Sequence, residues 1–192
     1  MRKLDSQEFY IVKQLVRNPR ISDNRISRNT GIPLRTVNRK RKKLEQDGLL
    51  SYFAYLHTFT DGLGHFEARC LVTIKLKYGI TRGMLQSSFD NEDNVVVFNS
   101  KHIFESHIGE SNGHAVLVMI IESMRHEDIL EILNAETIPN LRKSFGEDAI
   151  SDIQVIGLTL PMRMLHNYIP GRNVKNGKII KGWDDKFIYV DK

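Results

Sequence analysis

Six basic side chains within nine residues form the strongest chemical signal in the sequence. Residues 35–43 read Arg-Thr-Val-Asn-Arg-Lys-Arg-Lys-Lys. Lys and Arg contact phosphates, Arg pairs with guanine through two hydrogen bonds, and Asn pairs with adenine in the same way. The run therefore favours binding to a nucleic acid, although by itself it also fits a solvated basic face or a nuclear-localisation-like segment.

The distribution of charge supports a polyanion-binding module at the start of the chain. The 192 residues carry a net charge of +5, yet residues 1–50 alone hold 13 Lys and Arg against 5 Asp and Glu. The remaining residues carry a net charge of −3. Such asymmetry indicates a basic module joined to a part with another task.

Helices before the basic run are expected to position it. Asp5, with Glu8 three residues on, has the pattern of a capping box for a first helix that Asn18-Pro19 ends. Ser22 is expected to cap a short second helix over residues 23–29. A tight turn at the glycine that follows would then lead into the basic run, which is the order of a helix-turn-helix.

The basic run itself is expected to lie in a third helix over residues 34–47, between a turn at Gly31 and a stop at Gly48. Val37 and Leu44 are seven residues apart and are expected to face the other helices. Arg41 stands where a third apolar residue would be expected. We expect its aliphatic stem to cover the core while its charge reaches solvent.

The exposed side of this third helix is the expected DNA surface, because the start of a recognition helix meets base edges in the major groove. Ser22, the cap of the second helix, and Arg25 within that helix are assigned to the same surface. The sequence thus predicts binding to double-stranded DNA. Base contacts are assigned to Arg35, Thr36, Asn38 and Arg39, and phosphate contacts to Lys40, Lys42 and Lys43.

The next residues are expected to complete a winged DNA-binding domain over residues 1–56. Residues 49–56 are aromatic and alternating, which predicts a strand of the wing. We favour core or interface positions for these aromatic rings over a surface on which bases stack. Residues 57–67 contain Asp61-Gly62, a pair typical of turns and loops, and they are expected to be a linker.

A second domain is expected over residues 68–160, with the order β-α-β-β-α-β of the ferredoxin-like arrangement. Gly109 to Gly113, which contains Asn-Gly, is expected to be a hairpin turn, and Pro139 is expected to kink or end the second helix. An open sheet face would be covered by a second subunit, so a homodimer is expected. The strands are expected at 68–77, 95–107, 114–122 and 153–160, and the helices at 82–89 and from about 127.

Motifs of catalysis are missing from the sequence. It has no Walker loop, G-x-G-x-x-G, G-x-S-x-G or H-E-x-x-H. His102, His107 and His114 fall near one hairpin but lack the cysteine pairs or close histidine pairs of zinc sites, and Cys70 is expected to be a small buried apolar residue. We therefore expect no catalytic residue, no metal and no cofactor.

The remaining composition fits a cytoplasmic protein. A single cysteine permits no internal disulfide bond. No stretch approaches the roughly 18 apolar residues that span a bilayer, and the first residues do not have the pattern of a signal peptide. We accordingly expect no membrane partner.

The chain resembles the Lrp/AsnC family, the leucine-responsive or feast/famine regulators, over residues 4–160. The resemblance is carried by the helix-turn-helix with Ile21-Ser22-Asp23 and Gly31-Ile32, by residues 43–50, and by the domain order. It implies an α+β fold with an N-terminal winged helix-turn-helix and a C-terminal RAM/ACT-like ferredoxin domain. It also implies a transcription regulator that forms dimers or higher homo-oligomers.

The same resemblance implies a small-molecule effector, in many members an amino acid, at the turn formed by Gly109, Glu110, Ser111 and Asn112. The family often has Asp three residues after the glycine of this turn, whereas this chain has Asn112. Alternative functions are an enzyme on the same architecture, similar to siroheme decarboxylases, and an architectural protein that coats DNA with little sequence preference. The basic third helix favours DNA binding over the enzyme.

A C-terminal extension, residues 161–192, lies beyond the resemblance. Residues 174–179 contain Asn-Gly between Val-Lys and Lys-Ile, which predicts a small hairpin. The extension could be a subunit clasp, an additional DNA contact, a regulatory flap or a segment that packs on its own domain.

Overall fold

The computed structural model describes residues 3–53, 68–89, 102–175, 178–180, 183–184 and 188–190. It divides into two compact units. The first, called the helical unit, combines Met1–Tyr55 with Pro161–Lys192, and the second, called the sheet unit, is Leu56–Leu160. The C-terminal extension thus belongs to the N-terminal unit, and the expected linker at 57–67 lies outside the described residues.

Helix α1, Ser6–Arg17, begins with the expected capping box. The Asp5 carboxylate accepts the N–H of Glu8 at 2.9 Å, and the Glu8 carboxylate accepts the N–H of Asp5 at 3.0 Å. These two bonds satisfy amide groups that a helix start leaves without partners. Ile11 and Leu15 are buried on one side of α1.

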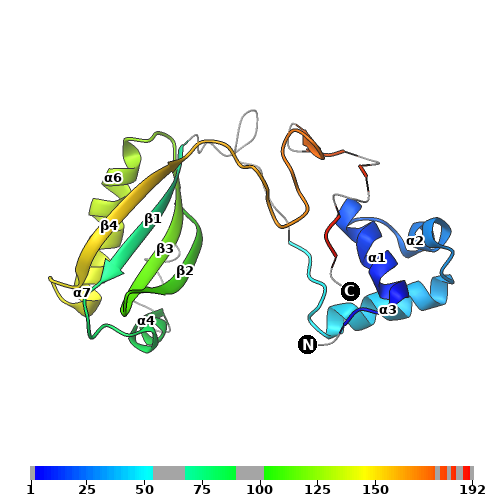
Figure 1. Cartoon of the computed structure of the whole chain (residues 1–192), viewed down its shortest axis with the longest axis horizontal. Coiled ribbons are helices and arrows are strands. Elements are labelled where there is room, and N and C mark those ends of the chain that lie inside the picture. The colour runs from blue at the N-terminus through cyan, green and yellow to red at the C-terminus, as the bar shows by residue number, and fades with distance from the viewer. Residues whose placement is uncertain are drawn as a thin grey trace. The chain divides into compact units, whose positions relative to one another are not determined.

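Helix α2, Asp23–Thr30, and helix α3, Leu34–Gln46, follow in the helix-turn-helix order shown in Figure 1. The Ser22 hydroxyl caps α2 by accepting the N–H of Arg25 at 3.3 Å. Gly31 takes φ of +72° between the two helices, a conformation that glycine adopts without strain. Val37 of α3 completes a small core made by Ile11, Leu15, Ile26, Ile32 and Val37.

The expected wing strand at 49–56 is wrong for the part that the structure describes, because residues 49–53 form no strand. The N–H groups of Leu49 and Leu50 both donate to the carbonyl of Leu44, at 3.0 and 3.1 Å. They close the end of α3 and are not available to a neighbouring strand. Residues 54–56 lie outside the described part.

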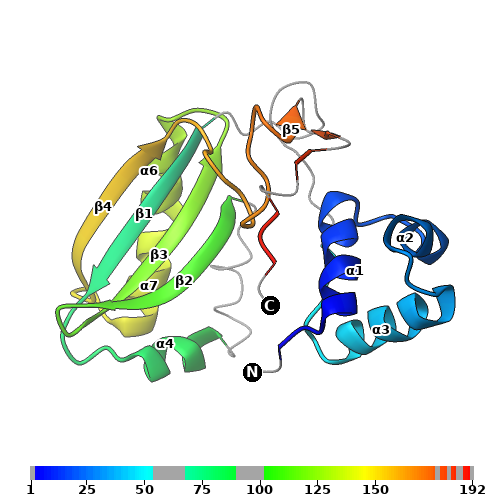
Figure 2. The same cartoon turned by 45° about the vertical axis from the view of Figure 1, so that its right-hand side comes forward.

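The sheet unit has the expected ferredoxin-like topology, with four antiparallel strands in the order β2-β3-β1-β4. Helix α4, Arg82–Phe89, lies near the end of the sheet where β1 finishes, and α6 and α7 run along one face (Figures 1 and 2). The strands are β1, Ala68–Leu76; β2, Ile103–Ser111; β3, His114–Ser123; and β4, Ile150–Leu158.

The hairpin between β2 and β3 is tighter than expected. Gly109 to Ser111 are strand residues paired with Val116 to His114, and only Asn112 and Gly113 form the turn. Both turn residues have positive φ, +51° and +77°, as in the two-residue turns that match strand twist. The strand expected at 95–107 is therefore displaced: β2 begins at Ile103, and residues 90–101 lie outside the described part.

The second helical segment of the sheet unit passes through Pro139 without ending there. Helix α6, Asp128–Ile132, continues through a π-helical stretch η1, Leu133–Thr137, into α7, Ile138–Phe145. Proline cannot donate to the carbonyl four residues back and its ring crowds that carbonyl. The wider π-helical turn removes this conflict. Of the two expected effects of Pro139, a kink or an end, the end is wrong.

Alternate residues of β1 separate two faces of the sheet. Cys70 and every second residue to Leu76 are buried in one core with Leu85 of α4, Ile129 of α6 and Leu141 of α7. On the other face a cross-strand row runs from Ile120 of β3 through Leu71 to Ile156 of β4. Ile156 is 53 % exposed, so this face carries uncovered apolar surface in the chain.

The C-terminal extension packs against α1. The Tyr168 hydroxyl donates to the carbonyl of Val16 at 3.2 Å, and Arg17 Nη2 donates to the carbonyl of Trp183 at 3.3 Å. Trp183 and Ile188 are buried. The expected hairpin is confirmed as β5, Val174–Lys175, paired with β6, Lys178–Ile179. No helix in the described residues is long and apolar enough to cross a membrane.

Candidate nucleic-acid interface

One face of α3 presents basic and amide side chains to solvent while the opposite face anchors the helix. Arg35, Asn38, Arg39 and Lys42 are all exposed. Their spacing of three and four residues places them on one side of the helix. Val37 and Leu44 are fully buried behind them. In the described part of the chain no acidic side chain pairs with Arg35, Arg39 or Lys42, so these cations are available to an anionic ligand.

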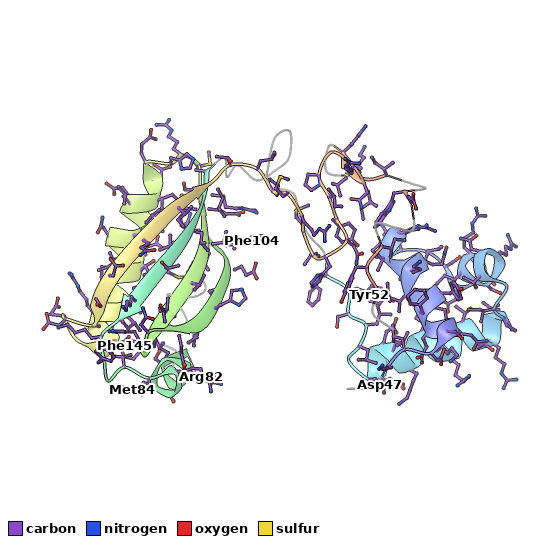
Figure 3. The ribbon with its side chains drawn as sticks, in the orientation of Figure 1. Asp47, Tyr52, Arg82, Met84, Phe104 and Phe145 are labelled. Carbon is purple, nitrogen blue, oxygen red and sulfur yellow. The ribbon has the colours of Figure 1, made fainter. Side chains whose placement is uncertain are left out.

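The other assigned residues around this face differ in their surroundings. Arg25 is exposed on α2, and Ser22 is exposed but engaged as the helix cap. Thr36 is half-buried. Lys43 remains 60 % exposed and forms an ion pair with Asp47, one turn later, at 2.6 Å. The end of α3 at Asp47 is labelled in Figure 3.

Lys40, expected among the phosphate contacts, has a different environment. Its side chain is only 12 % exposed and forms an ion pair with Asp5, the cap of α1. Burial alone raises the pKa of Asp5, but the hydrogen bond from Lys40 and the N–H of Glu8 outweigh it and lower the pKa below its ordinary value. Lys40 thus ties α3 to the start of α1 and is placed to support the fold.

Arg41 also behaves differently from expectation, since its guanidinium is held by protein groups and does not extend into solvent. Nη1 donates to the Asp23 carboxylate at 3.0 Å and to the carbonyl of Ile21 at 3.2 Å. Nε donates to Glu45 at 3.1 Å and to the hydroxyl of Tyr52 at 2.9 Å. A half-buried charge needs such partners to offset its lost hydration, and Arg41 therefore fastens α3 to the start of α2.

Tyr52, which is labelled in Figure 3, shares in this contact through its hydroxyl group. Its ring centroid lies 5.3 Å from the Arg41 guanidinium, a cation–π distance. Burial and the hydrogen bond to Glu45 raise the pKa of Tyr52. Burial lowers the pKa of Arg41, but its carboxylate partners Asp23 and Glu45 and the nearby Tyr52 outweigh this effect, so the pKa of Arg41 is raised above its ordinary value. Tyr52 thus packs on the helical unit's own surface, which agrees with a structural position for this ring.

An open hollow of about 560 Å³ lies between the start of α2 and the first half of α3. Leu34, Arg35 and Asn38 line it from α3, and Asp23 lines it from α2. The Asn38 amide nitrogen donates to the Asp23 carboxylate at 2.9 Å. Sequence reasoning missed Asn24 and Leu34 of this surface, and also Asp23. Its only sequence signal was its place just after the helix cap.

The residues assigned to an effector belong to the other unit, where they form part of the β2–β3 hairpin. Gly109, Glu110 and Ser111 are paired in β2, and Asn112 is in the turn. The Tyr78 hydroxyl donates to the carbonyl of Asn112 at 3.2 Å. The four residues are therefore brought together as one edge of a hairpin, but as strand and turn rather than as a loop.

The histidines near this hairpin each have separate partners. Nδ1 of His102 lies 3.0 Å from the Glu122 carbonyl, Nε2 of His107 lies 2.8 Å from Glu105, and Nδ1 of buried His114 lies 2.7 Å from the Leu76 carbonyl. Within the described ranges, no three His, Cys, Asp or Glu side chains gather around a common point. Cys70 is buried as expected, and burial raises the pKa of its thiol.

Comparison with known proteins found a family model that matches the first residues and solved structures that cover most of the chain. Residues 4–51 match the winged helix-turn-helix DNA-binding family. AsnC of E. coli is 14% identical and aligns with a TM-score of 0.60 over 85% of this chain and 97% of that one. LrpC of B. subtilis is 15% identical, with a TM-score of 0.61 over 84% of this chain and 99% of that one.

A third solved structure is a transcriptional regulator of Neisseria meningitidis in complex with L-Met. It is 12% identical and aligns with a TM-score of 0.61 over 84% of this chain and 94% of that one. A search of curated protein sequences found no significant match. The expected likeness is thus confirmed in the fold: residues 4–51 match the winged helix-turn-helix DNA-binding family model, and the chain has the fold of the solved AsnC and LrpC structures.

Proposed function

We propose that this protein is a transcription regulator that binds double-stranded DNA with α3 in the major groove. The observation that carries the proposal is the exposed face of Arg35, Asn38, Arg39 and Lys42 above fully buried Val37 and Leu44. Arg and Asn can read base edges there, and Lys can contact phosphates. Arg25 and Lys43 extend this basic surface, and Lys40 is left out of it because of its pair with Asp5.

The test measures binding of the full chain to a selected duplex and to a random duplex over a range of salt. Arg39→Ala is expected to weaken binding to the selected duplex by about 1–3 kcal/mol more than binding to the random duplex, because a base contact is lost. Lys42→Ala should weaken both alike and reduce the slope of log affinity against log salt by about 1.

Lys143→Ala serves as the matched control, since Lys143 is exposed on α7 of the sheet unit. Unchanged binding by Lys143→Ala together with the losses above supports the assignment. Equal losses on both duplexes for Arg39→Ala would remove its base-reading role. An affinity that is the same for all duplexes would favour the architectural alternative, and no binding in dilute salt would remove the proposal.

A homodimer through the open face of the sheet is part of the proposal. Among the described residues the helices α6 and α7 lie on one face, and the row of Ile120, Leu71 and Ile156 lies on the other. Burying such apolar area between two copies is favourable, and paired recognition helices suit paired half-sites in DNA.

Ile156→Glu is expected to convert the dimer to monomer at micromolar concentration, as measured by analytical ultracentrifugation. Charge buried in an apolar interface without a partner opposes association. Leu130→Glu is the control, because Leu130 is 60 % exposed on α6, on the side of the sheet that the helices cover. A dimer that persists in Ile156→Glu would exclude this face as the interface.

An effector at Gly109, Glu110, Ser111 and Asn112 remains part of the proposal, supported by the likeness to a regulator solved with L-Met. We infer that the protein carries out no catalysis and acts in the cytoplasm, where its DNA would be. His102, His107 and His114 each contact a different group, so their arrangement does not support the enzyme alternative.

A further inference from the structure

The side-chain amide of Asn38 has a determined orientation. Its Nδ2 lies 2.9 Å from a carboxylate oxygen of Asp23. A carboxylate only accepts hydrogen bonds, so the nitrogen of the amide and not its oxygen must face Asp23. This bond uses one of the two amide protons. The oxygen Oδ1 and the second proton remain for a ligand.

Asp23 is itself held firmly. Its second carboxylate oxygen accepts Nη1 of Arg41 at 3.0 Å, and its side chain is 19 % exposed. Arg41 is in turn held by Glu45 and by the carbonyl of Ile21. A chain of hydrogen bonds thus runs from the rear of α3 to Asn38 on its exposed face. Supporting contacts of this kind keep a recognition group in one orientation before its ligand arrives.

We propose that Asp23 is the positioning residue that makes Asn38 a reader of adenine, an inference that rests on the proposed DNA binding. Adenine offers an N6–H donor and the N7 acceptor in the major groove, and the remaining Oδ1 and N–H of the Asn38 amide complement this pair. Asp23 does not contact DNA. Its charge, which phosphates would repel, is compensated by Arg41.

The test begins with selection of duplexes from a random-sequence library by the full-length protein. Each position of the selected site is then changed to all four base pairs and titrated with the wild type, Asn38→Ala and Asp23→Ala. The wild type should prefer adenine at one position by about 5- to 150-fold, the range of a two-bond base contact. Asn38→Ala should abolish that preference. Asp23→Ala should reduce it by roughly 2- to 10-fold and leave the other positions unchanged.

Two further variants separate positioning from general loosening of the helices. Glu45→Gln weakens another contact of Arg41 but leaves the bond between Asp23 and Asn38, so it should retain the adenine preference. Asp23→Asn keeps the size of the side chain and one acceptor oxygen, and it should lose the preference only in part. Circular dichroism reports whether each variant keeps its helices.

Three results would overturn the inference: an adenine preference of Asp23→Ala equal to that of the wild type, a base other than adenine at the position that Asn38 controls, or no preference at any position. In the first two the wild type still reads bases in duplex DNA and the proposed function stands, whereas the third favours the architectural alternative. A wild type that binds no duplex in dilute salt removes the proposed function and this inference together.

Discussion

At the scale of single residues, the basic run divides into side chains that face solvent and side chains that hold the fold. Arg39 and Lys42 are exposed, whereas Lys40 pairs with Asp5 and Arg41 contacts Asp23, Glu45 and the Ile21 carbonyl. The two kinds lie on different sides of the helix because α3 turns 100° per residue. A count of cations in the run therefore overstates the charge that a DNA backbone would meet.

Arg41→Ala is expected to destabilise the helical unit by about 1–3 kcal/mol, because Asp23 and the Ile21 carbonyl lose a charged donor in a half-buried place. Lys42→Ala, the next residue and exposed, should change the free energy of unfolding by less than about 0.5 kcal/mol. Urea denaturation followed by circular dichroism gives both values. Equal stability of the two variants would mean that the Arg41 contacts contribute nothing measurable.

At the scale of elements, backbone conformation determines where the hairpin and the helices end. Gly31 and Gly113 have positive φ at the helix-turn-helix turn and at the β2–β3 turn. The hairpin turn is short because Ser111 pairs with His114 and leaves only two residues between the strands. The strand register thus determines the conformation of the four residues that are expected to bind an effector.

Gly113→Ala is expected to destabilise the sheet unit by about 1–2 kcal/mol, because φ of +77° crowds the Cβ of an L-residue against its own carbonyl oxygen. The space around Gly113 does not forbid the substitution, since the nearest atom to an added Cβ, on the Tyr78 ring, would be at 3.5 Å. Gly109→Ala is the control: an added Cβ there would be 3.9 Å from the Val116 carbonyl oxygen, and φ is not positive. Thermal unfolding of both variants checks the difference, and equal melting temperatures would contradict it.

At the scale of the whole molecule, the chain leaves the helical unit after Tyr55 and returns to it at Pro161. In the sequence, the sheet unit therefore lies between the two segments of the helical unit and is joined to them by two covalent connections. The net charge follows this division, because residues 161–192 hold 7 Lys and Arg against 3 Asp and Glu. The basic character of the helical unit thus comes from both of its sequence segments.

Leu15→Ala is expected to shift the unfolding transition seen by Trp183 fluorescence to lower denaturant concentration. Leu15 is buried on α1, and its truncation is expected to lower the free energy of unfolding by about 2–5 kcal/mol. Trp183 is the only tryptophan in the chain, so its fluorescence reports the C-terminal extension directly. Leu85→Ala, which leaves a comparable cavity in the sheet unit, should not move this transition. A Trp183 transition that follows Leu85→Ala instead would place the extension with the other unit.

Local chemistry was sufficient to predict the helix-turn-helix and the order of strands. Capping by Asp5 and Ser22, the turn at Gly31, and the buried spacing of Val37 and Leu44 all act within one or two helical turns. The alternation of β1 likewise marks its two faces from neighbouring residues alone. Such short-range preferences are written into the order of residues and need no knowledge of distant partners.

The tertiary structure alone decided which cations face solvent and where the C-terminal extension packs. Lys40 meets Asp5 from 35 residues away, and Tyr168 reaches Val16 from 152 residues away. Periodicity does not encode such pairings, because each partner alone looks like any exposed charge or loop aromatic. They form only when folded elements bring their polar atoms together at the loss of water contacts, which is a property of the assembled unit.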